Sequence, residues 1–123
     1  MILKDQFYTI TSIKESNSDL EANISINPSH EIFSGHFPGN PITPGVVQME
    51  MIKEILSVHF KKPLKLKAVD NCKFLALLNP AANSDLTVKI RFLSSDESVI
   101  KISGTITSES TRFLQIQSEY YFN

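Results

Sequence analysis

The feature that most constrains the fold is a single segment with helical periodicity, PGVVQMEMIKEILSVHF, which runs from Pro44 to about Phe60. Proline suits the first turn of a helix because its missing N–H would have no partner there, and Pro63 ends the segment. At about 100° per residue the apolar side chains cover a broad sector. The narrow polar stripe that remains consists of Glu50, Lys53, Glu54 and Ser57. A helix with so wide an apolar sector is expected to have other structure on most of its sides.

The rest of the chain is typical of β-strands separated by turns. The expected strands cover residues 7–13, 20–26, 64–78, 86–93, 99–106 and 113–122. Period-two alternation in VKIRF and IKISGTI favours an antiparallel sheet with one buried face. One sheet packed on one long helix is the simplest way to bury both apolar faces. The sequence therefore predicts an α+β fold in one domain, residues 1–123.

Composition narrows the class of protein. A chain of 123 residues is long enough for one core, and a net charge of −1 gives no indication of nucleic-acid binding. No apolar run approaches the roughly 20 residues of a membrane span, and no signal peptide is evident. The single cysteine, Cys72, excludes an internal disulfide and fits a reducing compartment, so we expect a cytoplasmic protein.

The segment SGHFPGNPITPGVVQME, residues 34–50, concentrates the unusual residues. Three of the four glycines and three of the six prolines lie in it, around His36 and ahead of Glu50. Such a loop can hold one side chain rigidly and expose bare backbone to a ligand. Gly45 lies in the first helical turn, where unpaired N–H groups can stabilise a carbonyl oxygen that gains negative charge. A base, a carboxylate and an oxyanion donor suit proton abstraction beside a carbonyl.

Ordinary structural roles remain open for these residues on composition alone. A loop histidine is often merely exposed, a glutamate on an amphipathic helix is often solvated, and the glycines and prolines can simply connect strand to helix. A metal site is not expected, because His30, Glu31 and His36 lack the spacing of an H-E-x-x-H motif.

The stretch GHFPGNPITPGVVQME resembles the active-site segment of FabZ-type 3-hydroxyacyl-acyl-carrier-protein dehydratases, which have a hotdog fold. VDNCKF, residues 69–74, is a weaker match to the strand after the helix. The resemblance implies that His36 removes the C2 proton of a 3-hydroxyacyl thioester, that Glu50 assists departure of the hydroxyl, and that the Gly45 N–H holds the thioester carbonyl. It also implies a homodimer with His36 and Glu50 from different subunits, a trimer of dimers as a further assembly, an acyl-carrier-protein substrate and no cofactor. Glutamate rather than aspartate implies dehydration without double-bond isomerisation.

The sequence also departs from the family. The His-Arg-Tyr-Pro-Phe-like stretch before the first strand is absent, PAANSD replaces a shorter turn, and Glu54 stands where the family has glutamine. Since residues i and i+4 share a helix face, we hypothesise that Glu50 raises the pKa of Glu54, or the reverse, so that one of them holds a proton for the leaving hydroxyl. A solvated Glu54 is the alternative.

Further residues are candidates with equal structural alternatives. Gln48 falls in the apolar sector and is either a supporting residue of the site or partly exposed. Phe33 and Phe37 flank His36 and either line an acyl tunnel or pack in the core. KKPLKLK could dock an acidic carrier protein or form a solvated strand edge, and its lysines are Lys61, Lys62, Lys65 and Lys67.

The sequence thus predicts dehydration of a 3-hydroxyacyl thioester on acyl carrier protein, in fatty acid or polyketide/polyene synthesis. A hotdog thioesterase and a non-catalytic acyl-thioester-binding partner subunit are the alternatives.

Overall fold

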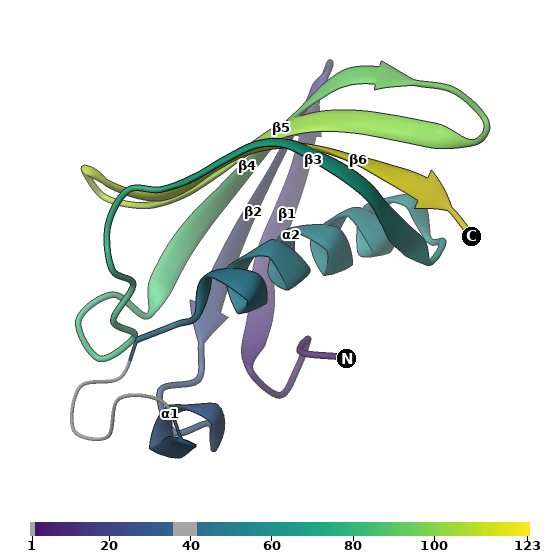
Figure 1. Cartoon of the computed structure of the whole chain (residues 1–123). Coiled ribbons are helices and arrows are strands. Elements are labelled where there is room, and N and C mark those ends of the chain that lie inside the picture. The colour runs from purple at the N-terminus through teal and green to yellow at the C-terminus, as the bar shows by residue number, and fades with distance from the viewer. Residues whose placement is uncertain (1, 36–41) are drawn as a thin grey trace.

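The computed structural model describes residues 2–35 and 42–123, and the His36 and Phe37 predictions fall outside them. The described chain forms one antiparallel sheet of six strands with the order β1-β2-β4-β5-β6-β3. The sheet curves around one long helix, α2 (Figure 1). The elements are β1 Tyr8–Ser16, β2 Asp19–Ile26, α1 Ile32–Gly35, α2 Gly45–Phe60, β3 Leu64–Phe74, β4 Asp85–Ser95, β5 Val99–Ser108 and β6 Thr111–Phe122. The predicted α+β architecture is confirmed.

Helix α2 lies where its sequence pattern requires. Its sheet-facing residues are buried, namely Val47, Gln48, Met51, Ile52, Ile55 and Leu56. A Cβ added at Gly104 of β5 would lie 3.5 Å from Ile52 Cδ1, so the helix passes directly over the middle of the sheet. It ends at Lys61, which has a left-handed φ of 56° and donates its N–H to the Ser57 and Val58 carbonyls.

Three local features differ from the sequence prediction. Strand β1 continues to Ser16 rather than ending at residue 13. Strand β3 ends at Phe74 rather than at 78, because the Leu78 carbonyl accepts a hydrogen bond from the Thr43 N–H at 2.8 Å and the chain turns toward the start of α2. The short helix α1 was not predicted, since four residues carry no readable period.

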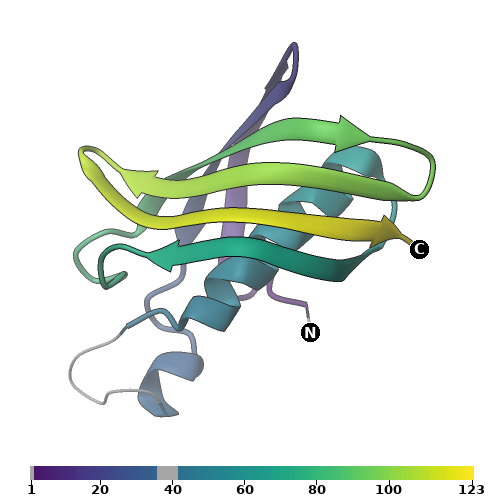
Figure 2. The ribbon, with the colours of Figure 1, turned by 45° about the horizontal axis from the view of Figure 1, so that its top comes forward.

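The sheet has two edges, β1 and β3. Figure 2 shows β3 beside β6, at the edge of the strands that cross over α2. Apolar side chains on and just after β3 are exposed, namely Leu66, Val69, Phe74, Leu75 and Leu77. A long edge with exposed apolar side chains is a surface on which another strand can pair. In the described part of the chain, no helix is long and apolar enough to cross a membrane.

Candidate active site

The candidate site lies at the N-terminal end of α2. Pro44 caps the helix, and its carbonyl accepts the first intrahelical bonds from the N–H groups of Val47 and Gln48 at 3.1 and 3.2 Å. Thr43, just before it, is fixed to Leu78 through the backbone. The start of α2 is therefore held between the helix and the segment after β3. The Gly45 N–H comes before these bonded groups, at the very start of the helix, where an N–H has no intrahelical acceptor.

The ring of Phe74 occupies the space that a side chain at position 45 would need. A Cβ built at Gly45 would lie 2.5 to 3.0 Å from three atoms of the Phe74 ring, closer than real Cβ contacts come. The Phe74 side chain is 52% exposed, so its ring covers the first turn of α2 from the solvent side. The contact between Phe74 and Gly45 could not be predicted from a local sequence pattern, because β3 and the start of α2 come together only in the fold.

Glu50 lies one and a half turns into α2 and is partly buried. Its Oε1 forms an ion pair with Lys53 Nζ at 2.9 Å, and the two side chains are 19% and 28% exposed. Two buried tyrosines lie within its electrostatic reach. Burial raises the pKa of Tyr8 and of Tyr120, and the negative charge of Glu50 adds to both shifts. Tyr8 and Tyr120 were not singled out from the sequence as part of this environment, whereas Lys53 was placed in one polar stripe with Glu50.

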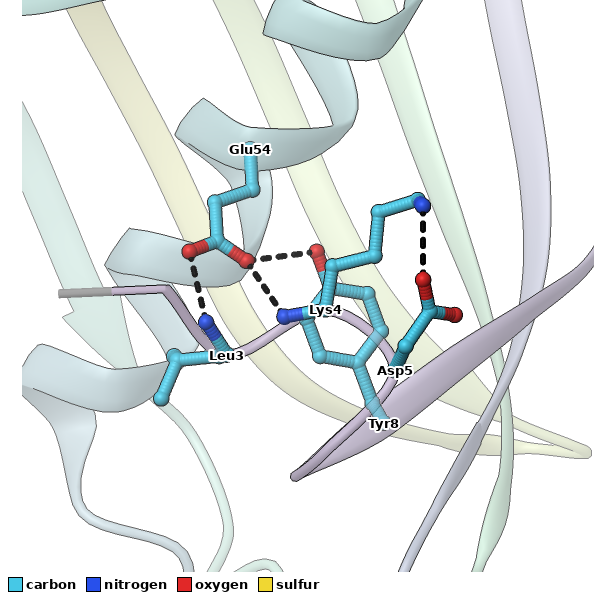
Figure 3. A network of polar contacts seen from close by, with 5 residues as sticks. All are labelled: Leu3, Lys4, Asp5, Tyr8 and Glu54. Atoms are coloured by element: carbon cyan, nitrogen blue, oxygen red, sulfur yellow. Dashed lines mark hydrogen bonds and ion pairs between the residues drawn. The ribbon is translucent and has the colours of Figure 1, made fainter.

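Glu54 has neighbours that differ from the predicted ones (Figure 3). Its Oε2 accepts the Leu3 N–H at 2.8 Å, while its Oε1 accepts the Lys4 N–H and the Tyr8 hydroxyl, both at 3.0 Å. Glu50 pairs with Lys53 instead. The described contacts of Glu54 are those of a residue that holds the N-terminal segment. They lend no support to a proton shared with Glu50, and a modulating role for Glu54 stays a prediction.

Gln48 is buried, and one of its two polar side-chain atoms has no hydrogen-bond partner among the residues that the structure describes. Its Nε2 donates to the Thr43 carbonyl at 3.2 Å, and its side chain is buried rather than in solvent. Gln48 Oε1 and Thr43 Oγ1 are buried without a hydrogen-bond partner among the described residues. The alternative of a partly exposed Gln48 is therefore wrong, and its supporting role stays a prediction.

The remaining candidates are Phe33 and the four lysines that follow α2. Phe33 is 7% exposed and packs on Phe7 in the core, with ring centroids 5.4 Å apart, and its role in an acyl tunnel stays a prediction. The four lysines begin where α2 ends, and a helix of 16 residues is about 24 Å long. Lys62 lies over the Phe122 ring and Lys67 pairs with Glu119, whereas the side chain of Lys65 is exposed.

A hollow of about 610 Å³ opens elsewhere, on the face of the sheet away from α2. Ion pairs Arg91–Asp19 and Lys89–Glu21 line it. None of the candidate site residues contributes to it. Among residues 2–35 and 42–123, no three histidine, cysteine, aspartate or glutamate side chains gather as metal ligands would.

A sequence profile of the ApeI-like family, described as ApeI dehydratase, matches residues 12–111. The chain belongs to this family. It is also similar to FabZ 3-hydroxyacyl-acyl-carrier-protein dehydratases. It is 31% identical to that of Haemophilus influenzae over 72% of this chain, and 29% identical to that of Novosphingobium aromaticivorans over 85%. The aligned part spans 66% of the length of the Haemophilus protein and 68% of the other.

Solved structures agree on the fold. The dehydratase heterocomplex ApeI:P from Xenorhabdus doucetiae matches with a TM-score of 0.70 at 17% identity, over 91% of this chain and 96% of that one. A hypothetical thioesterase from Streptococcus pneumoniae, solved with coenzyme A, matches with a TM-score of 0.66 at 13% identity, over 94% and 85%. At these identities the likeness concerns the backbone alone, and it confirms the hotdog fold.

Proposed function

We propose that this chain dehydrates a 3-hydroxyacyl thioester, carried on acyl carrier protein, to the trans-2-enoyl thioester without a cofactor. The observation that carries the proposal is the uninterrupted motif from His36 to Glu50, with Gly45 at the open end of a helix, in a chain of the ApeI-like dehydratase family.

Each residue then has one task. The Gly45 N–H binds the thioester carbonyl and stabilises the negative charge that develops when the C2 proton leaves. His36 is the base that takes this proton. The C3 hydroxyl takes up the proton that His36 removed from C2 and departs as water. The Glu50 carboxylate orients this hydroxyl by accepting its hydrogen bond, and the Lys53 ammonium at 2.9 Å fixes the orientation of that carboxylate.

The helix geometry supports a site shared between two copies of the chain. Gly45 and Glu50 are five residues apart, which separates them by about 140° around the helix axis and about 7.5 Å along it. The two groups therefore point in different directions from one helix. We propose a homodimer in which Glu50 of one copy acts beside Gly45 and His36 of the other, with a trimer of dimers as a further assembly.

The exposed edge of β3 is the surface that suits this dimer. An antiparallel pair of β3 strands, centred near Val69, would continue the sheet across both copies and cover the exposed apolar side chains. It would also bring Lys65 and Lys67 of one copy toward the end of β3 that lies beside Gly45 in the other. The lysines that are remote from Gly45 within one chain would then flank the thioester site of the other copy, where an acidic carrier protein could dock. The single cysteine supports work in the cytoplasm.

The test uses a panel of 3-hydroxyacyl thioesters on acyl carrier protein, with products identified by mass spectrometry. Wild type should remove one water, and His36→Ala and Glu50→Gln should each abolish the reaction while remaining folded. Asp96→Asn, in the turn between β4 and β5, is a matched control that should keep full activity. Release of free acid would favour a thioesterase. Binding without turnover would favour a partner subunit, in line with the heterocomplex described for the Xenorhabdus protein.

A further inference from the structure

The segment before β1 forms a closed turn, and the backbone N–H groups of its first two residues, Leu3 and Lys4, both donate to Glu54. Phe7 and Gln6 donate their N–H groups back to the Leu3 carbonyl at 2.7 and 3.1 Å, and Asp5 donates to the Tyr8 carbonyl at 2.7 Å. Asp5 adopts a left-handed φ of 69°, which costs free energy in a residue other than glycine. The N–H groups of Leu3 and Lys4 are left pointing outward from this turn, and Glu54 accepts both.

The same turn contacts α1 on its other side. Phe7 is fully buried, and its ring lies 5.4 Å from the Phe33 ring and 5.3 Å, edge-on, from the His30 ring. The Phe7 carbonyl also accepts the Asn27 N–H at 2.7 Å. Phe33 is three residues before His36 in the sequence.

Residues 3–8 therefore bridge the two segments that carry the proposed chemistry. On one side, Glu54 belongs to α2, one turn after Glu50 and on the same helix face. On the other side, α1 runs directly into the GHFP motif. The hydrogen bonds that the structure gives α1 and the residues just before it are local. The Ile32 N–H donates to His30 Nδ1, and the N–H groups of His30, Phe33 and Ser34 donate to the carbonyls three residues earlier. The turn and the carboxylate that closes it therefore link α1 to α2, beside the packing of Ile32 and Phe33 in the core.

We propose that Glu54 is a positioning residue, which acts through the turn of residues 3–8 to fix α1 relative to Gly45 on α2. This inference rests on the proposed dehydration. The carboxylate of Glu54 is suited to holding the turn, because two backbone N–H groups and one hydroxyl donate to its two oxygens. Hydrogen bonds to a charged acceptor are stronger than those to a neutral one. A glutamine offers one acceptor oxygen and an NH₂ group that faces donors, so it cannot satisfy all three.

The experiment compares Glu54→Gln and Glu54→Ala with Asp96→Asn. Asp96 also accepts two backbone N–H groups, from Ser98 and Val99 at 2.7 and 2.9 Å, but lies in the turn between β4 and β5. Each protein is assayed well below its unfolding temperature for kcat and KM on one thioester, and for hydrogen exchange of the amides of residues 30–34.

Both Glu54 variants should lower kcat by about tenfold or more, since small misplacements of a catalytic group cost that much, and leave KM within about twofold. Their α1 amides should exchange at least about tenfold faster. Asp96→Asn should change neither. A kcat that stays at the wild-type value in both Glu54 variants would overturn the proposal, and so would unchanged exchange in α1. If wild type itself turns over no thioester, the proposed dehydration fails, and the exchange experiment still decides whether Glu54 fixes α1.

Discussion

The hydrogen bond between Tyr8 and Glu54 leads to a prediction about stability at alkaline pH. Tyr8 is 1% exposed, and its hydroxyl donates to Glu54 Oε1 at 3.0 Å. Burial, the charge of Glu54 and this hydrogen bond together raise the pKa of Tyr8 far above its ordinary value, and Asp5 and Glu50 add to the shift. The folded protein therefore keeps the phenolic proton at pH values where the unfolded chain releases it.

The sign of the effect follows from proton binding. A tyrosine in the unfolded chain titrates near pH 10, so below that pH both states hold the proton and the contribution to stability is complete. Above it the folded state binds more protons than the unfolded state, and stability falls as the pH rises. At about pH 11 the loss from Tyr8 alone is about 1.4 kcal/mol.

Tyr8→Phe removes both the hydrogen bond and this titration. At about pH 8 the variant should be less stable than wild type by about 1.5–2 kcal/mol, the lower part of the range for a hydrogen bond to a charged acceptor, because Glu54 keeps two other donors. At about pH 11 wild type has lost about 1.4 kcal/mol that the variant cannot lose, so the deficit should shrink to about half a kcal/mol or less. The loss from Tyr120 occurs in both proteins and cancels.

Urea unfolding at each pH measures these differences. Tyr121→Phe is the control, because Tyr121 is 43% exposed. Its stability relative to wild type should stay nearly constant between the two pH values. A Tyr8→Phe deficit that is equal or larger at the higher pH would refute the network drawn around Glu54.

Two further predictions concern the start of α2 and the edge of the sheet. Gly45→Ala should lower kcat/KM by about tenfold or more, because the added methyl group crowds the carbonyl site. Its thermal stability should change little, because the Phe74 ring that the methyl group displaces is exposed. Unchanged steady-state kinetics would argue against a thioester at Gly45. If the proposed dimer forms through β3, Val69→Lys should convert it into an inactive monomer in analytical ultracentrifugation, because the change places two like charges at the centre of a β3–β3 pair. A dimer that persists would exclude this edge as the interface.

The sequence predicted the parts of the fold that depend on local periodicity. The limits of α2 were correct to within one residue, because the apolar pattern is strong and Pro44 marks its start. The central strands β4 and β5 alternate strictly and were placed correctly. The end of β3 was misplaced because the bond from Thr43 to Leu78 joins residues 35 positions apart, and no local pattern encodes it.

The site was only partly predictable for the same reason. A helical wheel places Glu50 and Glu54 on one face, but it cannot tell what that face meets. The partners of Glu54 are residues 3, 4 and 8, which lie about 50 positions away in the sequence. Likewise, Phe74 reaches Gly45 only because β3 returns along α2. The motif supplies the candidate groups for the proposed chemistry, and the fold determines their neighbours.

The most direct test of the account is the fate of a 3-hydroxyacyl thioester on acyl carrier protein, followed by mass spectrometry with wild type and His36→Ala in parallel. The account predicts that wild type converts the substrate to an enoyl thioester by loss of one water, and that the variant does not. A wild-type protein that leaves every 3-hydroxyacyl thioester intact, or a His36→Ala variant that dehydrates it as fast as wild type, would contradict the account.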